Sequence, residues 1–197
     1  LMRAGCGIVH SERSDKTGGI APWRFHGLQF WLALPQESED SPPAFFHYES
    51  RHIPQMRSEN ALCNVVMGRA LGLISPVKHW YNTLLLDIRL SAGATIALAD
   101  AEERGCYVLS GQVRINDTVL QQGDLGLLSD EASQMQARED SHCIVFGGEK
   151  IGARYMDWNF VSSDKAAVVQ AIADWQAGKF PPIPDDSGAV LPYPTKK

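Results

Sequence analysis

The chain has 197 residues, a formal net charge of −5 and a pI of about 5.6. Hydrophobic residues make up 44% of it, and 17 Gly with 11 Pro supply many turn points, which is typical of a β-rich globular protein. Apart from Lys196 and Lys197 it has no cluster of basic residues, so nothing favours direct binding of nucleic acid. It also shows no apolar run of membrane-spanning length and no signal-peptide pattern at its start, and we expect a cytoplasmic protein without membrane association.

The cysteines are widely scattered along the chain, at Cys6, Cys63, Cys106 and Cys143. They share no CxxC spacing, and three of them lie in apolar, strand-like runs. This pattern predicts buried free thiols rather than a zinc site or a disulfide framework.

The first third of the chain alternates between apolar and turn-rich segments. Gly27–Pro35 is largely apolar and predicts a buried strand that proline ends. The acidic, proline-containing segment 36–43 predicts a solvated loop, with an acidic docking segment as the less common alternative. We place a domain boundary near residue 60.

Short apolar runs separated by Gly, Asn, Asp and Ser recur after residue 60, as in a β-barrel or sandwich. Asn116 and Asp117 tolerate the left-handed conformation and predict a hairpin turn. The main expected strands are Thr83–Leu90, Gly105–Ser110, Gln112–Ile115, Gly126–Leu128 and Cys143–Phe146.

One helix is predicted, over about residues 163–177. Its apolar residues Val168, Ile172 and Trp175 share a face, Ser162 or Ser163 can cap its start, and Gly178 can end it. The proline-rich tail from Phe180 onward is expected to run extended over a surface.

His10 and Glu12 are the candidate metal ligands, because in an extended segment they point to the same face. Imidazole and carboxylate suit non-haem iron. A His and a Glu two residues apart nevertheless belong more often to a hydrogen-bonded turn than to a metal site.

For His26, His47, His52, His79 and His142 we expect surface or structural hydrogen-bonding roles. Cys143 cannot form a catalytic pair with His142, since neighbouring residues of a strand face opposite ways.

Five segments resemble, in the right order, sequence patterns of the pirin family: Ala4–Glu12, Gly27–Pro35, Ala70–Val77, Tyr107–Val113 and Phe146–Glu149. The resemblance implies an all-β bicupin, with two cupin-type β-barrels in tandem and a short C-terminal helix. Residues 1–60 would then be the C-terminal remainder of the N-terminal barrel. Residues 61–197 would form the C-terminal barrel with the helix and the extended tail.

In the pirin family the metal, usually iron, is held in the N-terminal barrel by three histidines and a glutamate. His10 and Glu12 match the later histidine and the glutamate, whereas the upstream HxH pair has no counterpart in this sequence. We therefore expect an incomplete first barrel, whose exposed strand edges offer a route to homo-oligomers. The second barrel is expected to be metal-free, because Ala97–Ala101 contains no histidine.

The resemblance implies an Fe(II)-dependent dioxygenase that cleaves flavonols such as quercetin in the intact protein. Glu12 would then act as a metal ligand and as a catalytic proton acceptor. The alternative is a non-enzymatic, redox-sensitive regulator that acts through protein partners. The acidic net charge suits contact with another protein better than contact with DNA. In that case this chain could also be a metal-free fragment.

Overall fold

The computed structural model describes residues 1–12, 26–186 and 188–194, which fall into two compact units. The barrel unit consists of Leu1 and Phe46–Ile151, and the helix unit of the described residues of Met2–Phe45 and Gly152–Lys197. This division differs from the boundary expected near residue 60. The reason is that β3 (Gln55–Arg57) pairs antiparallel with β4 (Ala61–Met67) and so belongs to the same sheet as the strands that follow.

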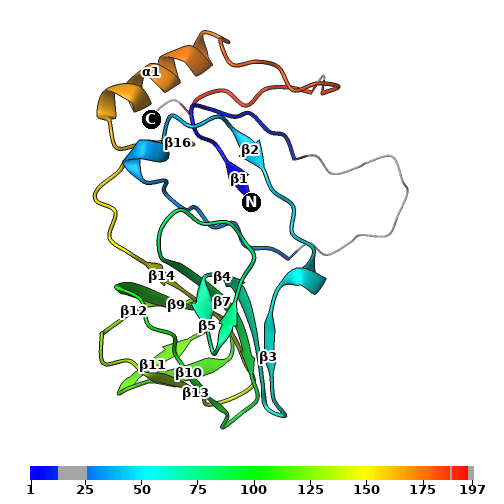
Figure 1. Cartoon of the computed structure of the whole chain (residues 1–197), viewed down its shortest axis with the longest axis vertical. Helices are drawn as coiled ribbons and strands as arrows, with labels where there is room; N and C mark the ends of the chain where they lie inside the picture. Colours follow the sequence, from blue (N-terminus) through cyan, green and yellow to red (C-terminus); the bar gives the residue numbers. More distant parts are fainter. Residues whose placement is uncertain (13–25, 187, 195–197) are drawn as a thin grey trace. The chain divides into compact units, whose positions relative to one another are not determined.

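The barrel unit contains two antiparallel sheets (Figure 1). The larger sheet has the order β12-β9-β14-β7-β4-β3, and the smaller has the order β11-β10-β13-β8. The remaining bounds are β5 (Arg69–Ala70), β6 (Leu73–Ile74), β7 (Thr83–Leu90), β8 (Thr95–Ala97), β9 (Glu103–Ser110), β10 (Gln112–Ile115), β11 (Thr118–Gln121), β12 (Leu125–Leu128), β13 (Gln134–Ala137) and β14 (Ser141–Gly148). The strands expected from the apolar runs are therefore confirmed, and the 3-10 turn η2 (Ser50–His52) precedes β3.

Alternation along the strands builds much of the core of the barrel unit. In β7, Leu86 and Ile88 are buried, whereas Asp87 between them lies on the outer face. The same alternation in the other strands fills the space between the sheets, mainly with Cys63, Val65, Cys106, Val108, Val113, Ile115, Met135, Cys143 and Val145. Each large aliphatic side chain buried in this way contributes about 1.5–3 kcal/mol.

The hairpin between β10 and β11 turns at Asn116 and Asp117, as predicted. Ile115 pairs with Thr118, so the loop has two residues, and Asn116 adopts a φ of 52°. Asparagine tolerates this left-handed conformation better than most residues, which explains its presence here.

Arg104 holds two loops against β9 from inside the barrel unit. Its guanidinium is buried and donates to the carbonyl oxygens of Ala99 (3.1 Å), Ala132 (2.8 Å) and Ser129 (2.8 Å). A planar group with several N–H donors can reach these separate acceptors at once, which a lysine ammonium cannot do as well.

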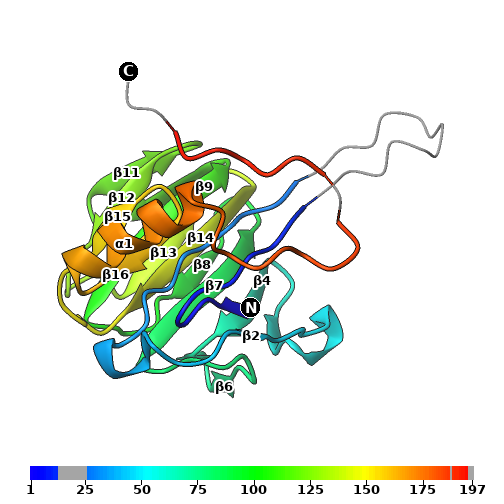
Figure 2. The same cartoon turned by 90° about the horizontal axis from the view of Figure 1, so that it is seen from above.

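The helix unit joins the two ends of the described chain. Two short strands, β1 (Met2–Arg3) and β2 (Ala44–Phe45), pair with each other, and the 3-10 turn η1 (Gln36–Ser38) precedes β2. A hairpin of β15 (Tyr155–Asp157) and β16 (Phe160–Ser162) leads into α1 (Lys165–Gln176), which packs on it (Figure 2). Among the described residues no helix is long and apolar enough to cross a bilayer.

The C-terminal helix is confirmed, but its expected N-cap is wrong. Asp164 caps α1, since its side chain accepts a hydrogen bond of 2.8 Å from the Ala166 N–H. Ser162 and Ser163 instead bind the Glu39 carboxylate. The predicted end is right: Gly178 has a φ of 67° and its N–H donates to the Trp175 carbonyl at 3.0 Å.

The buried strand predicted for Gly27–Pro35 is also wrong. This segment forms no ladder with another described strand, and the side chains of Leu28, Phe30 and Trp31 are exposed. A run of apolar residues becomes a strand only where a neighbouring strand takes its backbone hydrogen bonds, and no described strand does so here.

Candidate functional site

A tight turn precedes the segment that carries His10 and Glu12. Gly5 has a φ of 54°, and a Cβ atom at this position would lie 1.8 Å from the Ser41 carbonyl oxygen. That same oxygen accepts a hydrogen bond of 2.9 Å from the Cys6 N–H. Only glycine fits at residue 5, so the glycine of this segment is explained by the close approach of two backbones.

His10 and Glu12 lie beyond this turn in backbone without regular structure, and both are exposed. Their donor types suit non-haem iron, but such a centre commonly uses two histidines and a carboxylate. Among the described residues no group of three or more His, Cys, Asp and Glu side chains could hold a metal ion. Two donors fall short of that set, so the described residues do not by themselves form an iron site.

Glu39 anchors the helix unit near this segment of the chain. Its carboxylate forms a 2.7 Å ion pair with Arg154 Nε and accepts hydrogen bonds from the Ser162 hydroxyl (2.8 Å) and from the Ser163 N–H (2.9 Å) and hydroxyl (3.0 Å). Burial is the largest single effect on the Glu39 pKa and raises it, but these hydrogen bonds and the Arg154 charge together hold the pKa below its usual value.

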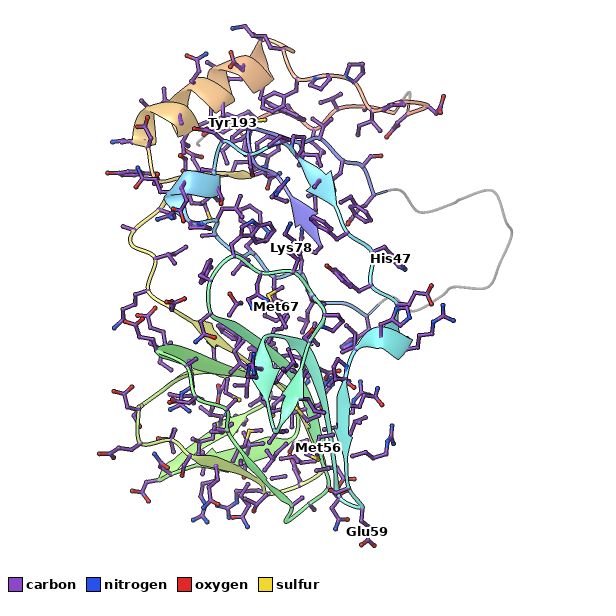
Figure 3. The ribbon with its side chains drawn as sticks, viewed as in Figure 1. His47, Met56, Glu59, Met67, Lys78 and Tyr193 are labelled. Carbon is purple, nitrogen blue, oxygen red and sulfur yellow. The ribbon has the colours of Figure 1, made fainter. Side chains whose placement is uncertain are left out.

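An aromatic cluster packs beneath α1 in the helix unit. The Trp158 ring meets the rings of Phe160, Trp175 and Tyr193 edge to face, with centroid distances of 5.3–5.9 Å. Tyr193, labelled in Figure 3, donates a 2.8 Å hydrogen bond to Asp157 Oδ1, and this bond is the main reason that the Tyr193 pKa is raised. This packing fixes the C-terminal tail on the helix unit.

The same cluster extends to the turn at Gly5. The Phe180 ring is tilted against Phe160 and edge to face with Trp175, and a Cβ atom at Gly7 would lie 3.4 Å from the Phe180 ring. The turn that precedes His10 is thus packed against the C-terminal tail of the same unit. Sequence reasoning missed this contact, because nothing local in the sequence connects residue 7 with residue 180.

The other histidines have the surface or structural positions that we expected. His26, His47 and His52 are exposed, and His79 Nδ1 lies 3.1 Å from the Val77 carbonyl oxygen. His142 lies on the outer face of the larger sheet, whereas Cys143 is buried in the interior, which confirms that the two do not pair.

His142 has a partner that the sequence analysis did not identify. Its Nε2 lies 2.6 Å from Asp87 Oδ1, and the second carboxylate oxygen accepts a 2.8 Å hydrogen bond from Asn64 Nδ2. The period-two pattern of β4, β7 and β14 places all three side chains on the outer face and was the available signal. The arrangement is a partly buried hydrogen-bond network across three neighbouring strands.

A hollow of about 350 Å³ lies on the outer face of the smaller sheet. It is lined by Gly93, Arg114, Gln136, Ala137 and Arg138. These residues offer cationic and amide groups but no carboxylate or imidazole, so the hollow has no acid–base pair for catalysis.

The two antiparallel sheets around one apolar core make the barrel unit a cupin-type domain, and residues 85–181 match the family model of the pirin C-terminal cupin domain. The chain is 36% identical over 200 residues to a pirin-like protein of Caulobacter vibrioides, covering 98% of this chain and 68% of the relative. This chain therefore belongs to the pirin family. The all-β cupin fold expected from the resemblance is confirmed.

Two further comparisons bear on the rest of the architecture. Pirin of Homo sapiens is 28% identical over 188 residues, covering 90% of this chain and 63% of that protein. A crystal structure of quercetin 2,3-dioxygenase from Acinetobacter baumannii superposes with a TM-score of 0.69 at 25% identity, covering 76% of this chain and 55% of that one. The chain thus spans between about half and two thirds of the length of these proteins.

Proposed function

We propose that the protein to which this chain belongs is a metal-dependent dioxygenase that acts on a flavonol-like aromatic substrate. The observation that carries the proposal is the structural likeness to the quercetin 2,3-dioxygenase of Acinetobacter baumannii. Since the chain covers 55% of that structure, the activity is proposed for the whole architecture rather than for this chain alone.

His10 and Glu12 are proposed as two donors of the metal site, with Fe(II) as the metal. Both side chains are exposed, and the turn before them is held by Ser41 and packed against Phe180. The remaining donors would be the HxH pair of the family pattern, which has no counterpart in this sequence. Glu12 would also accept the proton of a substrate hydroxyl at its carboxylate oxygen.

The ligand assignment is tested by iron retention. A protein with the whole two-barrel architecture, including this chain, is reconstituted anaerobically with Fe(II), desalted and analysed for metal, alongside His10→Ala, Glu12→Gln and the control His52→Ala, which removes another exposed histidine. The assignment is supported if the unmodified protein retains about one iron per chain, both site variants lose this iron, and the control keeps it. Equal retention in His10→Ala and the unmodified chain would refute it.

The activity is tested separately, by oxygen uptake with quercetin under air. A fully iron-loaded sample of the protein is expected to consume oxygen, and Glu12→Gln is expected to slow the reaction by about 100-fold or more, because it removes both a metal ligand and the proton acceptor. No oxygen uptake by a fully loaded sample would exclude the dioxygenase.

A second candidate function is non-enzymatic regulation through protein contacts, including contacts between copies of this chain. It is favoured by Leu125 and Leu127, which are 60% and 89% exposed on β12, an edge strand of the larger sheet. Sedimentation velocity over a range of concentrations should show self-association that Leu127→Lys abolishes. A constant monomeric mass for both proteins would remove the support for this candidate.

A further inference from the structure

Two adjoining hollows lie on the outer face of the smaller sheet, whose strands β10, β11 and β13 are labelled in Figure 1. The first has a volume of about 350 Å³ and the second a volume of about 220 Å³. Arg114 and Gln136 line both hollows, and Arg138 lines the first. Because they share two side chains, the hollows form one groove, which we call the arginine groove after Arg114 and Arg138. Its larger part falls in the range of about 300–1,000 Å³ that is typical of small-molecule sites.

The strand register brings the two arginines to the same place in this groove. Arg114 on β10 pairs directly with Gln136 on β13, so both side chains project from the same face. Arg138 follows two residues after Gln136, and its N–H donates to the Gln112 carbonyl oxygen at 2.8 Å. The chain therefore stays extended, and Arg138 shares the face of Gln136. The two arginines are diagonal neighbours, about 7–8 Å apart, which long side chains can span to reach one ligand.

No carboxylate neutralises these arginines. Arg114 Nη2 donates to Gln136 Oε1 at 3.0 Å, which is a bond to an uncharged amide. No acidic side chain lines either hollow, and neither arginine forms an ion pair with another described residue. Asp140, two residues beyond Arg138, accepts a 2.9 Å hydrogen bond from the Ala92 N–H instead. Since the whole chain has a net charge of −5, the groove is a local concentration of positive charge that attracts an anion.

The donors in the groove suit a phosphate group that is joined to hydroxyl groups. Guanidinium groups match the geometry of phosphate oxygens and bind them with charge-assisted hydrogen bonds. A phosphate monoester carries about 1.5–2 negative charges near neutral pH, which two arginines balance better than the single charge of a carboxylate. In the second hollow Thr95, Asn116 and Ser133 supply hydroxyl and amide groups, which can bind the hydroxyls of a ligand. Thr95 pairs directly with Gln136, so the two ends of the groove adjoin.

We propose that the arginine groove binds a sugar phosphate. Arg114 and Arg138 hold the phosphate, and the hollow that contains Thr95 binds the sugar hydroxyls. The groove involves neither His10 nor Glu12, so this site does not depend on the proposed dioxygenase activity.

The test is isothermal titration calorimetry of the full chain at low ionic strength, where charges on exposed groups are least screened. Glucose 6-phosphate is the probe, and inorganic phosphate, glucose and glucuronate are the comparisons. Glucose 6-phosphate is expected to bind, and inorganic phosphate should bind at least about threefold more weakly because it lacks the hydroxyl contacts. Glucose should show no measurable binding, and glucuronate should bind more weakly than glucose 6-phosphate.

Variants of exposed residues assign the binding to the groove. Arg114→Gln and Arg138→Gln should each raise the Kd for glucose 6-phosphate by at least about tenfold, as loss of a charged hydrogen-bond donor does. Arg57→Gln is the matched control, because it removes the same charge from an exposed position on β3 of the larger sheet. Thr95→Val keeps the branched shape and should weaken binding of glucose 6-phosphate but not of inorganic phosphate. Circular dichroism checks that each variant is folded.

Two groups of outcomes would overturn the proposal. No binding of glucose 6-phosphate, or equal weakening in Arg57→Gln and Arg138→Gln, would show that the groove is not a specific anion site. Equal Kd values for glucose 6-phosphate and inorganic phosphate, no effect of Thr95→Val, or tighter binding of glucuronate would rule out a sugar phosphate as the ligand.

Discussion

Glu39 and Arg154 form an ion pair of 2.7 Å between Glu39 Oε1 and Arg154 Nε within the helix unit. Their side chains are 17% and 10% exposed, so the pair is largely removed from water. Arg154 Nη2 also donates to the Leu34 carbonyl oxygen at 2.8 Å. These contacts join the segment around η1 to the segment before β15 and explain how the two ends of the chain form one unit.

Glu39→Gln should destabilise the helix unit, because the amide keeps the shape but loses the charge that pairs with Arg154. We expect a loss of about 1–3 kcal/mol in the free energy of unfolding. Denaturant unfolding followed by tryptophan fluorescence measures it, since Trp158 and Trp175 lie in this unit. Glu37→Gln, an exposed change in η1, is the control and should leave the unfolding free energy unchanged.

The contribution of Glu39 should depend on pH. The Glu39 pKa is lowered in the folded protein, so its stabilisation is fully present above the unfolded-state pKa of about 4.3 and disappears as the pH falls through the folded-state pKa. The difference in unfolding free energy between the unmodified protein and Glu39→Gln should therefore shrink between about pH 7 and about pH 3. A difference that stays constant over this range would contradict the lowered pKa.

Arg104→Lys should destabilise the barrel unit, although the charge is conserved. Lysine cannot reach the carbonyl oxygens of Ala99, Ala132 and Ser129 together, and buried acceptors without donors cost free energy. We expect a loss of about 2–4 kcal/mol in denaturant unfolding. Arg114→Lys is the control, because Arg114 is exposed and bonds to Gln136 on the surface. Equal effects of the two changes would rule out the proposed role of Arg104.

The strands of the barrel unit could be predicted from sequence because the signals for them are local. Alternation along β7 and the Asn116–Asp117 turn depend on residues that are neighbours in the chain, and both predictions are confirmed. The same holds for the end of α1 at Gly178. In each case the local preference and the tertiary structure agree.

The parts that could not be predicted depend on contacts between distant residues. Ser162 and Ser163 have good capping side chains, but the Glu39 carboxylate binds both, and Asp164 caps the helix instead. The apolar run Gly27–Pro35 fits a strand, yet no described strand pairs with it. His10 and Glu12 were selected by their spacing and donor types and then by family resemblance, and their role as ligands stays a prediction, because the described residues hold only part of a donor set.

Thiol reactivity should separate Cys6 from the other three cysteines. Cys6 is exposed, whereas Cys63, Cys106 and Cys143 are buried, and burial together with the Asp87 charge raises the pKa of Cys63 to about 11. Near neutral pH a thiol reagent should therefore label one cysteine quickly, and the remaining three only on unfolding. Cys6→Ser should abolish the fast phase. Fast labelling of more than one thiol would contradict the closed interior of the barrel unit.

Gly5→Ala tests the turn that precedes the candidate metal ligands. The new Cβ atom would lie 1.8 Å from the Ser41 carbonyl oxygen, at a backbone φ of 54°. The control is Gly178→Ala in the same unit, which has a φ of 67° but no atom within 4 Å of the added Cβ. The control should cost about 1–2 kcal/mol from backbone strain alone.

Gly5→Ala should cost clearly more than this control in denaturant unfolding, because the Ser41 backbone must move and the Cys6 hydrogen bond is lost. If His10 and Glu12 bind iron, the same change should also lower iron retention, while Gly178→Ala leaves it unchanged. Equal unfolding free energies for the two variants would show that the approach of Ser41 to Gly5 is loose. In that case the position of the segment that carries His10 would not be fixed by this turn.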